Sequence, residues 1–307
     1  MIKKASLLVL IIGAALLLLG RSGGVPAQEL PPTPSAIQPP HLAKLQPTAT
    51  TQRRLQTTVT QTPRISLLTL SPTLPPQLTP TRQWLYHSPG ELAVPVLLYH
   101  HVADTDEPRR YFVSPENFET QISSLHDWGY TAIPLSLLVE AMLNGAELPP
   151  RPVVITFDDS YRDVYQNALP VMQRYGFVGT IYIIVDQIGV GGYLNTRQIA
   201  QLIEQGWELG SHSQTHANLR KSGVSIEKEL TGSKETLELL FDTPVRSFSY
   251  PYGSATPAIT QLVKASGYRS AVGIGASITH RTKNLYYLSR NEVQGTFDLV
   301  TFAGLLR

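Results

Sequence analysis

The chain has 307 residues, of which 42% are hydrophobic, so it is long enough for one or two domains with a buried core. Its formal net charge is only +2, and lysine and arginine occur in no run longer than a pair, which gives no electrostatic case for nucleic-acid binding. There is no cysteine, which excludes disulfides, thiolate metal ligands and a cysteine nucleophile. Any metal is therefore expected to bind nitrogen and oxygen ligands.

Residues 1–27 have the pattern of an export signal. Lys3 and Lys4 precede an apolar run over residues 5–20, and Ala27 ends a small-residue stretch typical of a cleavage site. The run is shorter than the roughly 20 residues of a membrane span. Cleavage after Ala27 is favoured over an uncleaved membrane anchor, and either outcome predicts an exported protein, secreted or held at the cell surface.

Residues 28–90 are rich in proline, threonine and glutamine and have little apolar periodicity. Such a segment cannot bury enough apolar surface to offset the entropy of ordering, so we predict a disordered stalk. It would hold a domain away from a membrane or within a cell wall. A linker with no sequence-specific role is the alternative.

The folded domain is predicted over residues 91–307, where short apolar runs alternate with segments of helical periodicity. The predicted strands are 94–100, a short one after residue 130, 152–157, 178–185, 207–212, 247–253, 268–274 and 285–293. The predicted helices are 115–129, one ending at Gly145, 165–176, 195–206, 225–241, 257–267 and a short one at the C-terminus.

This alternation predicts an α/β fold in which helices cover a parallel sheet, and the number of repeats suggests a closed or nearly closed β/α barrel. In such folds the chemistry gathers at the carboxyl ends of the strands. Asp158 and Asp159 follow one predicted strand, and His212 and His216 follow another. We therefore expect these four side chains to lie near each other.

Two imidazoles and one carboxylate suit Zn²⁺ or another divalent first-row ion and leave positions open for water and substrate. Asp159, His212 and His216 form such a set, and Asp158 is then free to take a proton from water at the metal. Each motif by itself can be explained without a catalytic site, because Asp-Asp-Ser often caps a helix and a His-x-x-x-His pair is often exposed. Their joint occurrence at strand ends favours a catalytic metal site.

These motifs carry a resemblance to a known family. The segments TFDDSY (156–161), HSQTH (212–216) and YPYG (250–253) resemble the three leading motifs of the polysaccharide deacetylases, the NodB-homology or carbohydrate esterase family 4 group. VPVLLYHHV (94–102) is similar to the opening strand of the branch with exopolysaccharide and peptidoglycan deacetylases. The resemblance covers about residues 94–300, and it implies a distorted β/α barrel and metal-dependent removal of acetyl groups from N-acetylglucosamine units.

Carried over residue by residue, the resemblance implies that Asp158 is the catalytic base and that Asp159, His212 and His216 bind the metal. It also implies that the backbone N–H of Tyr252 stabilises the oxyanion. A plain structural turn is the alternative for the Pro-Tyr-Gly segment around Tyr252.

The sequence departs from the family pattern near the base. Many members have an arginine three residues before the motif-three tyrosine, where this chain has Ser249. Arg290 is our candidate to replace it, because a guanidinium can pair with Asp158 and keep it ionised. Arg246 is the second candidate, and an exposed arginine with no role is the alternative for both.

Two further parts of the family pattern are missing. No Leu-x-His motif supplies a general acid, so His280, His100 and His101 are candidates by position, with a buried structural histidine as the alternative. No motif provides a pocket-forming tryptophan, since Trp128 and Trp207 read as core residues. His100 and Tyr250 are predicted to contact substrate, and four tyrosines are possible sugar-stacking platforms, namely Tyr161, Tyr193, Tyr250 and Tyr252.

The sequence thus predicts an exported, metal-dependent deacetylase acting on an N-acetylglucosamine polysaccharide such as peptidoglycan, a chitin-like polymer or poly-N-acetylglucosamine. Zn²⁺ is the favoured ion, with Co²⁺ or another first-row ion as the alternative. The expected partners are the acetylated polysaccharide and, through the N-terminal segment, the cell wall or membrane surface. The alternatives are a catalytically weak glycan-binding module and a deacetylase of O-acetylated or xylan substrates.

Overall fold

The structure is a computed structural model that describes residues 83–106 and 110–307. The predicted signal or anchor (1–27) and most of the predicted linker lie outside the described residues. Within the described ranges, no helix combines the length and apolar character that crossing a membrane requires. Export, anchoring and the domain boundaries therefore stay predictions.

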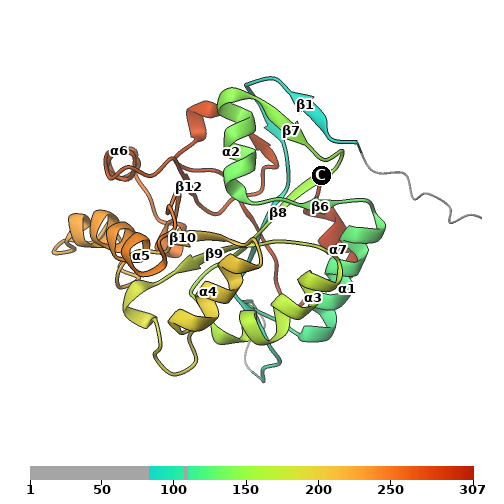
Figure 1. The fold of residues 1–307 in the computed structure, drawn as a ribbon, viewed down its shortest axis with the longest axis horizontal. Helices are drawn as coiled ribbons and strands as arrows, with labels where there is room; N and C mark the ends of the chain where they lie inside the picture. The colour runs from blue at the N-terminus through green and yellow to red at the C-terminus, as the bar shows by residue number, and fades with distance from the viewer. Residues whose placement is uncertain (1–82, 107–109) are drawn as a thin grey trace, which may run out of the picture. The chain divides into compact units, whose positions relative to one another are not determined.

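A parallel sheet of eight strands forms the centre of the fold (Figure 1). Its order is β12-β11-β10-β9-β8-β3-β14, with β6 pairing beside β8. The strands are β3 (Val96–Tyr99), β6 (Thr131–Ala132), β8 (Pro152–Phe157), β9 (Thr180–Ile183), β10 (Glu208–Ser211), β11 (Ser247–Ser249), β12 (Ser270–Val272) and β14 (Asn291–Glu292). The predicted α/β class with a parallel sheet is confirmed.

The sheet is strongly curled, and its two ends meet at one segment. β14 pairs with β3, and just before β14 a single parallel bridge joins Leu288 to Val272 of β12. Main-chain hydrogen bonds on either side of Val272 support this bridge, since Gly273 donates to Leu288 and Leu288 donates to Ala271. The predicted barrel is thus a curled half-barrel with a narrow main-chain link across its opening.

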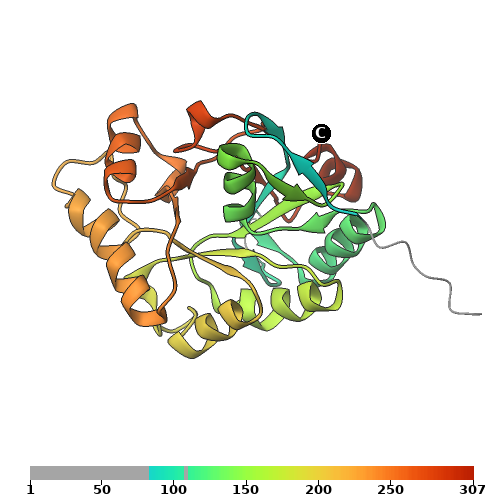
Figure 2. The same ribbon diagram turned by 45° about the horizontal axis from the view of Figure 1, so that its top comes forward.

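Helices lie around the outside of the sheet (Figures 1 and 2). They are α1 (Pro115–Asp127), α2 (Leu135–Asn144), α3 (Leu169–Arg174), α4 (Thr196–Glu204), α5 (Ser233–Phe241), α6 (Pro257–Ala265) and α7 (Leu299–Gly304), with wider π turns at Val164–Ala168 before α3 and Lys228–Gly232 before α5. Side chains fix where several begin. Ser114 caps α1 with Pro115 in its first turn, and Asn195 and Gln198 form a capping box on α4.

Burial on both faces of the sheet explains why the central strands have unbroken apolar sequences. All four residues of β3 are buried, and so are residues 153–157 of β8, because helices cover one face of the sheet and its curl encloses the other. On α1 the buried residues Phe118, Ile122 and Leu125 share one face, as helical spacing requires.

Six short strands of the structure were not predicted from the sequence. They pair as β1 (Leu85–His87) with β7 (Ala146–Leu148), β2 (Leu92–Ala93) with β13 (Thr279–His280), and β4 (His101–Val102) with β5 (Phe112–Val113). Strands of two or three residues have no periodicity to read. The sequence predicted that the folded domain begins at Glu91. Because β1 pairs with β7, the described structure includes a paired strand before that residue.

Close packing inside the curl predicts that Gly210→Ala destabilises the protein. A Cβ on Gly210 of β10 would overlap the fully buried Tyr182 ring and press on Ser247. We expect a loss of about 1–3 kcal/mol, typical of overpacking a core. Gly191→Ala is the matched control, because a Cβ there meets open space at an ordinary backbone angle. Urea unfolding of both variants measures the difference, and equal midpoints would contradict this description of the core.

Candidate active site

Four strand ends bring polar side chains to one pocket at the carboxyl edge of the sheet. His100 follows β3, Asp158 and Asp159 follow β8, His212 follows β10, and Tyr250 follows β11. The pocket has a volume of about 450 Å³. It is lined by these five residues together with His101, Arg110, Tyr111, Phe112, Tyr161, His216, Tyr252, Gly253, Ile274 and Glu292. The structure thus gathers the two predicted motifs in one place.

Asp159, His212 and His216 offer one ligand atom each, all within 4.8 Å of one another. The Asp159 Oδ1 atom lies 3.2 Å from the Nε2 atoms of both histidines, yet it is buried and makes no hydrogen bond. His212 Nδ1 lies 2.8 Å from the carbonyl of Ser249; donation there leaves Nε2 with a lone pair toward Asp159. Three ligand atoms that converge in this way fit a divalent cation.

The electrostatic environment of His212 also favours a cation at this site. Burial by itself would lower the pKa of His212, but the carboxylates of Asp158 and Asp159 outweigh burial and raise it. The site therefore attracts positive charge, which a proton or a metal ion can supply. Metal binding requires the neutral imidazole, so an ion would displace the proton.

Positive φ angles gather around the candidate metal ligands. Six non-glycine residues of the described chain have positive φ, and five of them are at these strand ends, namely Asp159, Ser160, Ser213, His216 and Tyr252. Such angles cost free energy and persist only where neighbouring contacts enforce them. Here the Ser160 hydroxyl accepts from the N–H of Ile184, and the Ser213 hydroxyl accepts from the N–H of His216.

Asp158 forms a buried, bidentate ion pair with Arg290. Arg290 donates from Nη1 to Oδ1 at 2.8 Å and from Nη2 to Oδ2 at 2.7 Å, and only 1% of Arg290 is exposed. Its other three N–H groups reach Thr156, Ser249 and the carbonyl of Gly273, so every guanidinium donor is used. Burial alone would raise the pKa of Asp158, but Arg290 and His212 outweigh burial and lower it.

Ser249 takes part in this network, although no functional role for it was predicted from the sequence. Its hydroxyl donates to Asp158 at 2.9 Å and accepts from Arg290, and its carbonyl orients His212. The serine therefore contacts Asp158, Arg290 and His212 at once. Arg246, the second candidate for pairing with the base, is exposed and is wrong for that role.

The two predicted tyrosines have different positions. Tyr252 is 64% exposed and its ring centroid lies 4.6 Å from that of His216, so it stands at the pocket mouth. Tyr250 is 1% exposed, donates its hydroxyl to the carbonyl of Tyr286 and packs against Phe248. Tyr250 nevertheless lines the active-site pocket, so its contact with substrate stays a prediction.

The three histidines that were candidates for the general acid have different environments. His280 is 1% exposed and its Nε2 contacts the carbonyl of Val94, so it is a structural residue and not an acid. His101 is stacked between Phe112 and Tyr161, with Nδ1 held at 2.6 Å by Asp163. His100 lines the pocket with a buried Nδ1 that has no hydrogen-bond partner. Burial lowers the pKa of His100 while the two aspartates oppose that shift.

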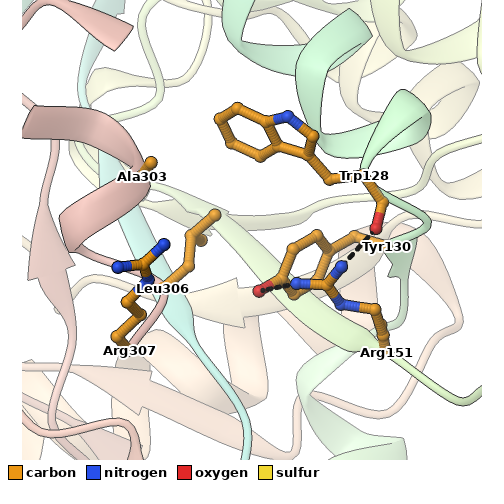
Figure 3. Close-up of a pocket in the computed structure, with 6 residues that line it drawn as sticks. All are labelled: Trp128, Tyr130, Arg151, Ala303, Leu306 and Arg307. Atoms are coloured by element: carbon orange, nitrogen blue, oxygen red, sulfur yellow. Dashed lines mark hydrogen bonds between the residues drawn. The ribbon is translucent and has the colours of Figure 1, made fainter. Parts of the chain in front are cut away.

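A second pocket lies away from this chemistry (Figure 3). Arg151 donates to the hydroxyl of Tyr130 and to the carbonyl of Trp128, opposite Leu306 and Arg307. Arg151 immediately precedes β8, whereas the aspartates follow it. This pocket is therefore at the amino end of the strand, and its lining includes none of Asp159, His212 and His216.

Comparison with known proteins decides the family. A polysaccharide deacetylase from Bacillus cereus is 31% identical in its solved structure, with 71% of this chain and 70% of that one covered and a TM-score of 0.63. The sequence model of the polysaccharide deacetylase family matches residues 145–271. The chain belongs to the polysaccharide deacetylase family. The predicted resemblance is thereby confirmed, and the chain is a hydrolytic deacetylase.

Two other relatives of this polysaccharide deacetylase extend the comparison. A poly-β-1,6-N-acetyl-D-glucosamine N-deacetylase of Staphylococcus aureus is 26% identical over 203 residues, covering 61% of this chain and 70% of that protein. The structure of a Streptococcus pyogenes deacetylase in complex with acetate is 21% identical, with a TM-score of 0.64 over 70% of this chain and 99% of that one. The second likeness shows the shared fold.

The buried ion pair predicts a double-mutant result in this deacetylase. Arg290→Met leaves the Asp158 carboxylate buried without a counter-charge, so we expect a loss of about 3–5 kcal/mol in stability at neutral pH. The double variant Arg290→Met/Asp158→Asn removes that charge and should be more stable than Arg290→Met alone. Urea unfolding measures both. If the second substitution made the loss larger, the pair would not be the stabilising contact described here.

Proposed function

We propose that this enzyme removes N-acetyl groups from an N-acetylglucosamine polysaccharide by a metal-dependent hydrolysis. The observation that carries the proposal is the position of the Asp158–Arg290 pair directly beside Asp159, His212 and His216. One carboxylate is kept ionised and free of the metal set, and its neighbour completes that set. This division of roles is what hydrolysis of an unreactive amide requires.

A divalent ion bound by Asp159, His212 and His216 would lower the pKa of water and polarise the acyl oxygen. Asp158 accepts the proton of the attacking water, and Arg290 holds its carboxylate in position. The N–H of Tyr252 donates to the acyl oxygen as negative charge develops there. The C–N bond then breaks, which releases acetate and an amine that needs a proton.

We assign the proton donor to His100. It follows β3, lines the same pocket as Asp158 and has a ring nitrogen without a protein partner. His101 lines the pocket too, but its Nδ1 is held by Asp163 and its ring is stacked on both sides. His101 is therefore better placed to shape the pocket wall than to donate a proton.

The substrate is supported by a relative and by the pocket. The Staphylococcus aureus relative is named for its action on poly-β-1,6-N-acetyl-D-glucosamine. The pocket here is open and has exposed tyrosines at its mouth, as sugar sites commonly do. The glycan-binding alternative is less favoured, because a module without turnover has no need of a buried arginine that keeps a second carboxylate ionised.

Metal dependence gives the first test. Chelation should reduce acetate release from N-acetylglucosamine oligomers to background, and added Zn²⁺ or Co²⁺ should restore it, because the ligand set uses neutral imidazole and carboxylate donors. Acetate is measured directly, with peptidoglycan and acetylated xylan as alternative substrates. The control is chelator already saturated with Zn²⁺. Release that persists in metal-free protein would contradict the proposal, and release from xylan alone would change the substrate.

The base gives the second test. Asp158→Asn should lower kcat about a hundredfold or more, because the amide cannot accept the proton of water. Asp242→Asn is the matched control, since Asp242 is an exposed residue at the end of α5 with a backbone angle that asparagine tolerates. Zinc content is measured for both. A variant that lost its zinc together with its activity would not support a separate role for Asp158.

A further inference from the structure

Glu292 is a largely buried carboxylate that has no part in the catalytic steps above. Its side chain is 9% exposed and lines the active-site pocket. One carboxylate oxygen, Oε2, accepts from Arg110 and from Gln294, each at 3.2 Å. The other oxygen, Oε1, is buried and has no hydrogen-bond partner. A buried carboxylate oxygen without a donor is costly, so its retention calls for an explanation.

The strand geometry places Glu292 beside the catalytic centre. Glu292 is two residues after Arg290, so the two side chains leave the chain on the same side. Glu292 also pairs in register with Leu98 on β3, two residues before His100. The charge of Glu292 acts on His100, and both residues line the pocket. Glu292 is thus the next residue after Arg290 on the same side of this segment, and Arg290 is the partner of Asp158.

The surroundings of Glu292 have the composition of a sugar site. Tyr111 is 44% exposed, and its ring centroid lies 4.7 Å from that of His100. The guanidinium of Arg110 lies over the Tyr111 ring at 5.1 Å and pairs with Glu292. An aromatic ring next to a carboxylate and a guanidinium offers an apolar face, an acceptor and donors, which together match a saccharide.

We propose that Tyr111, Arg110 and Glu292 form a saccharide subsite, in which Glu292 Oε1 accepts a hydrogen bond from the sugar unit next to the one being deacetylated. This inference rests on the proposed function. The donor is a sugar hydroxyl or the ammonium of a unit already deacetylated. Glu292 is a positioning residue here, because it holds the polymer while Asp158 and the metal ligands act on the acetyl group.

The test compares a polymeric substrate with a minimal one, using the full chain loaded with Zn²⁺. The kcat/KM for an N-acetylglucosamine pentamer and for 4-nitrophenyl acetate is measured in the wild type and in Glu292→Gln. We expect the ratio of pentamer to ester to fall about tenfold in Glu292→Gln, mainly through KM, the effect of one lost hydrogen bond to a charged acceptor. Glu147→Gln, at an exposed glutamate of β7, should leave the ratio unchanged.

A second variant and a second substrate identify why the pentamer-to-ester ratio falls. Arg110→Ala removes the ion pair but leaves Oε1 in place, so its ratio should fall less than that of Glu292→Gln. A pentamer with one glucosamine next to the reacting unit separates the donors. If the donor is ammonium, the wild type prefers this substrate and Glu292→Gln loses the preference; if it is a hydroxyl, the loss is equal for both pentamers.

The outcomes that overturn the inference are separate from those that overturn the proposed function. An unchanged ratio in Glu292→Gln would show that Glu292 does not bind the sugar. Wild-type protein that cleaves the ester but releases no acetate from the pentamer would overturn the proposed substrate, and the subsite would fall with it.

Discussion

The buried ion pair between Asp158 and Arg290 is the contact on which the rest of the site depends. Removing two charges from water is expensive, and here it is offset by two direct hydrogen bonds and by full use of the guanidinium donors. The partners are 132 residues apart in the sequence. They meet because the last strand segment returns to β3 and touches β12, so the curl of the sheet and the geometry of the base are one constraint.

Ser249 connects this ion pair to His212, one of the proposed metal ligands. Its side chain touches Asp158 and Arg290, while its carbonyl lies against the Nδ1 of His212. A single residue at the end of β11 therefore contacts the proposed base, its counter-ion and a proposed metal ligand. Positive φ angles at Asp159, His216 and Tyr252 complete the arrangement, because they turn the chain back toward the pocket where each strand ends.

The pocket has two functional parts in this view. Its floor carries Asp158, the proposed base, together with the proposed metal ligands Asp159, His212 and His216. One wall carries Tyr111, Arg110 and Glu292, whose chemistry suits the remainder of a sugar chain. A deacetylase of polymers needs both parts, because remote contacts position the reacting unit and supply binding energy that the acetyl group alone cannot.

The sequence by itself determined the alternating elements, the strand-end position of Asp158 and Asp159, and the grouping of Asp159 with His212 and His216, because these depend on local periodicity and on the rule that parallel strands end at one edge. Arg290 was already a candidate partner for Asp158, because Ser249 stands where the family pattern has an arginine and a guanidinium can keep a carboxylate ionised. Only the tertiary structure decided that His280 and Tyr250 are core residues, that Ser249 links base and ligand, and that Glu292 has an oxygen without a partner. Burial and hydrogen-bond satisfaction are set by what packs around a residue from distant parts of the chain, and no local pattern records them.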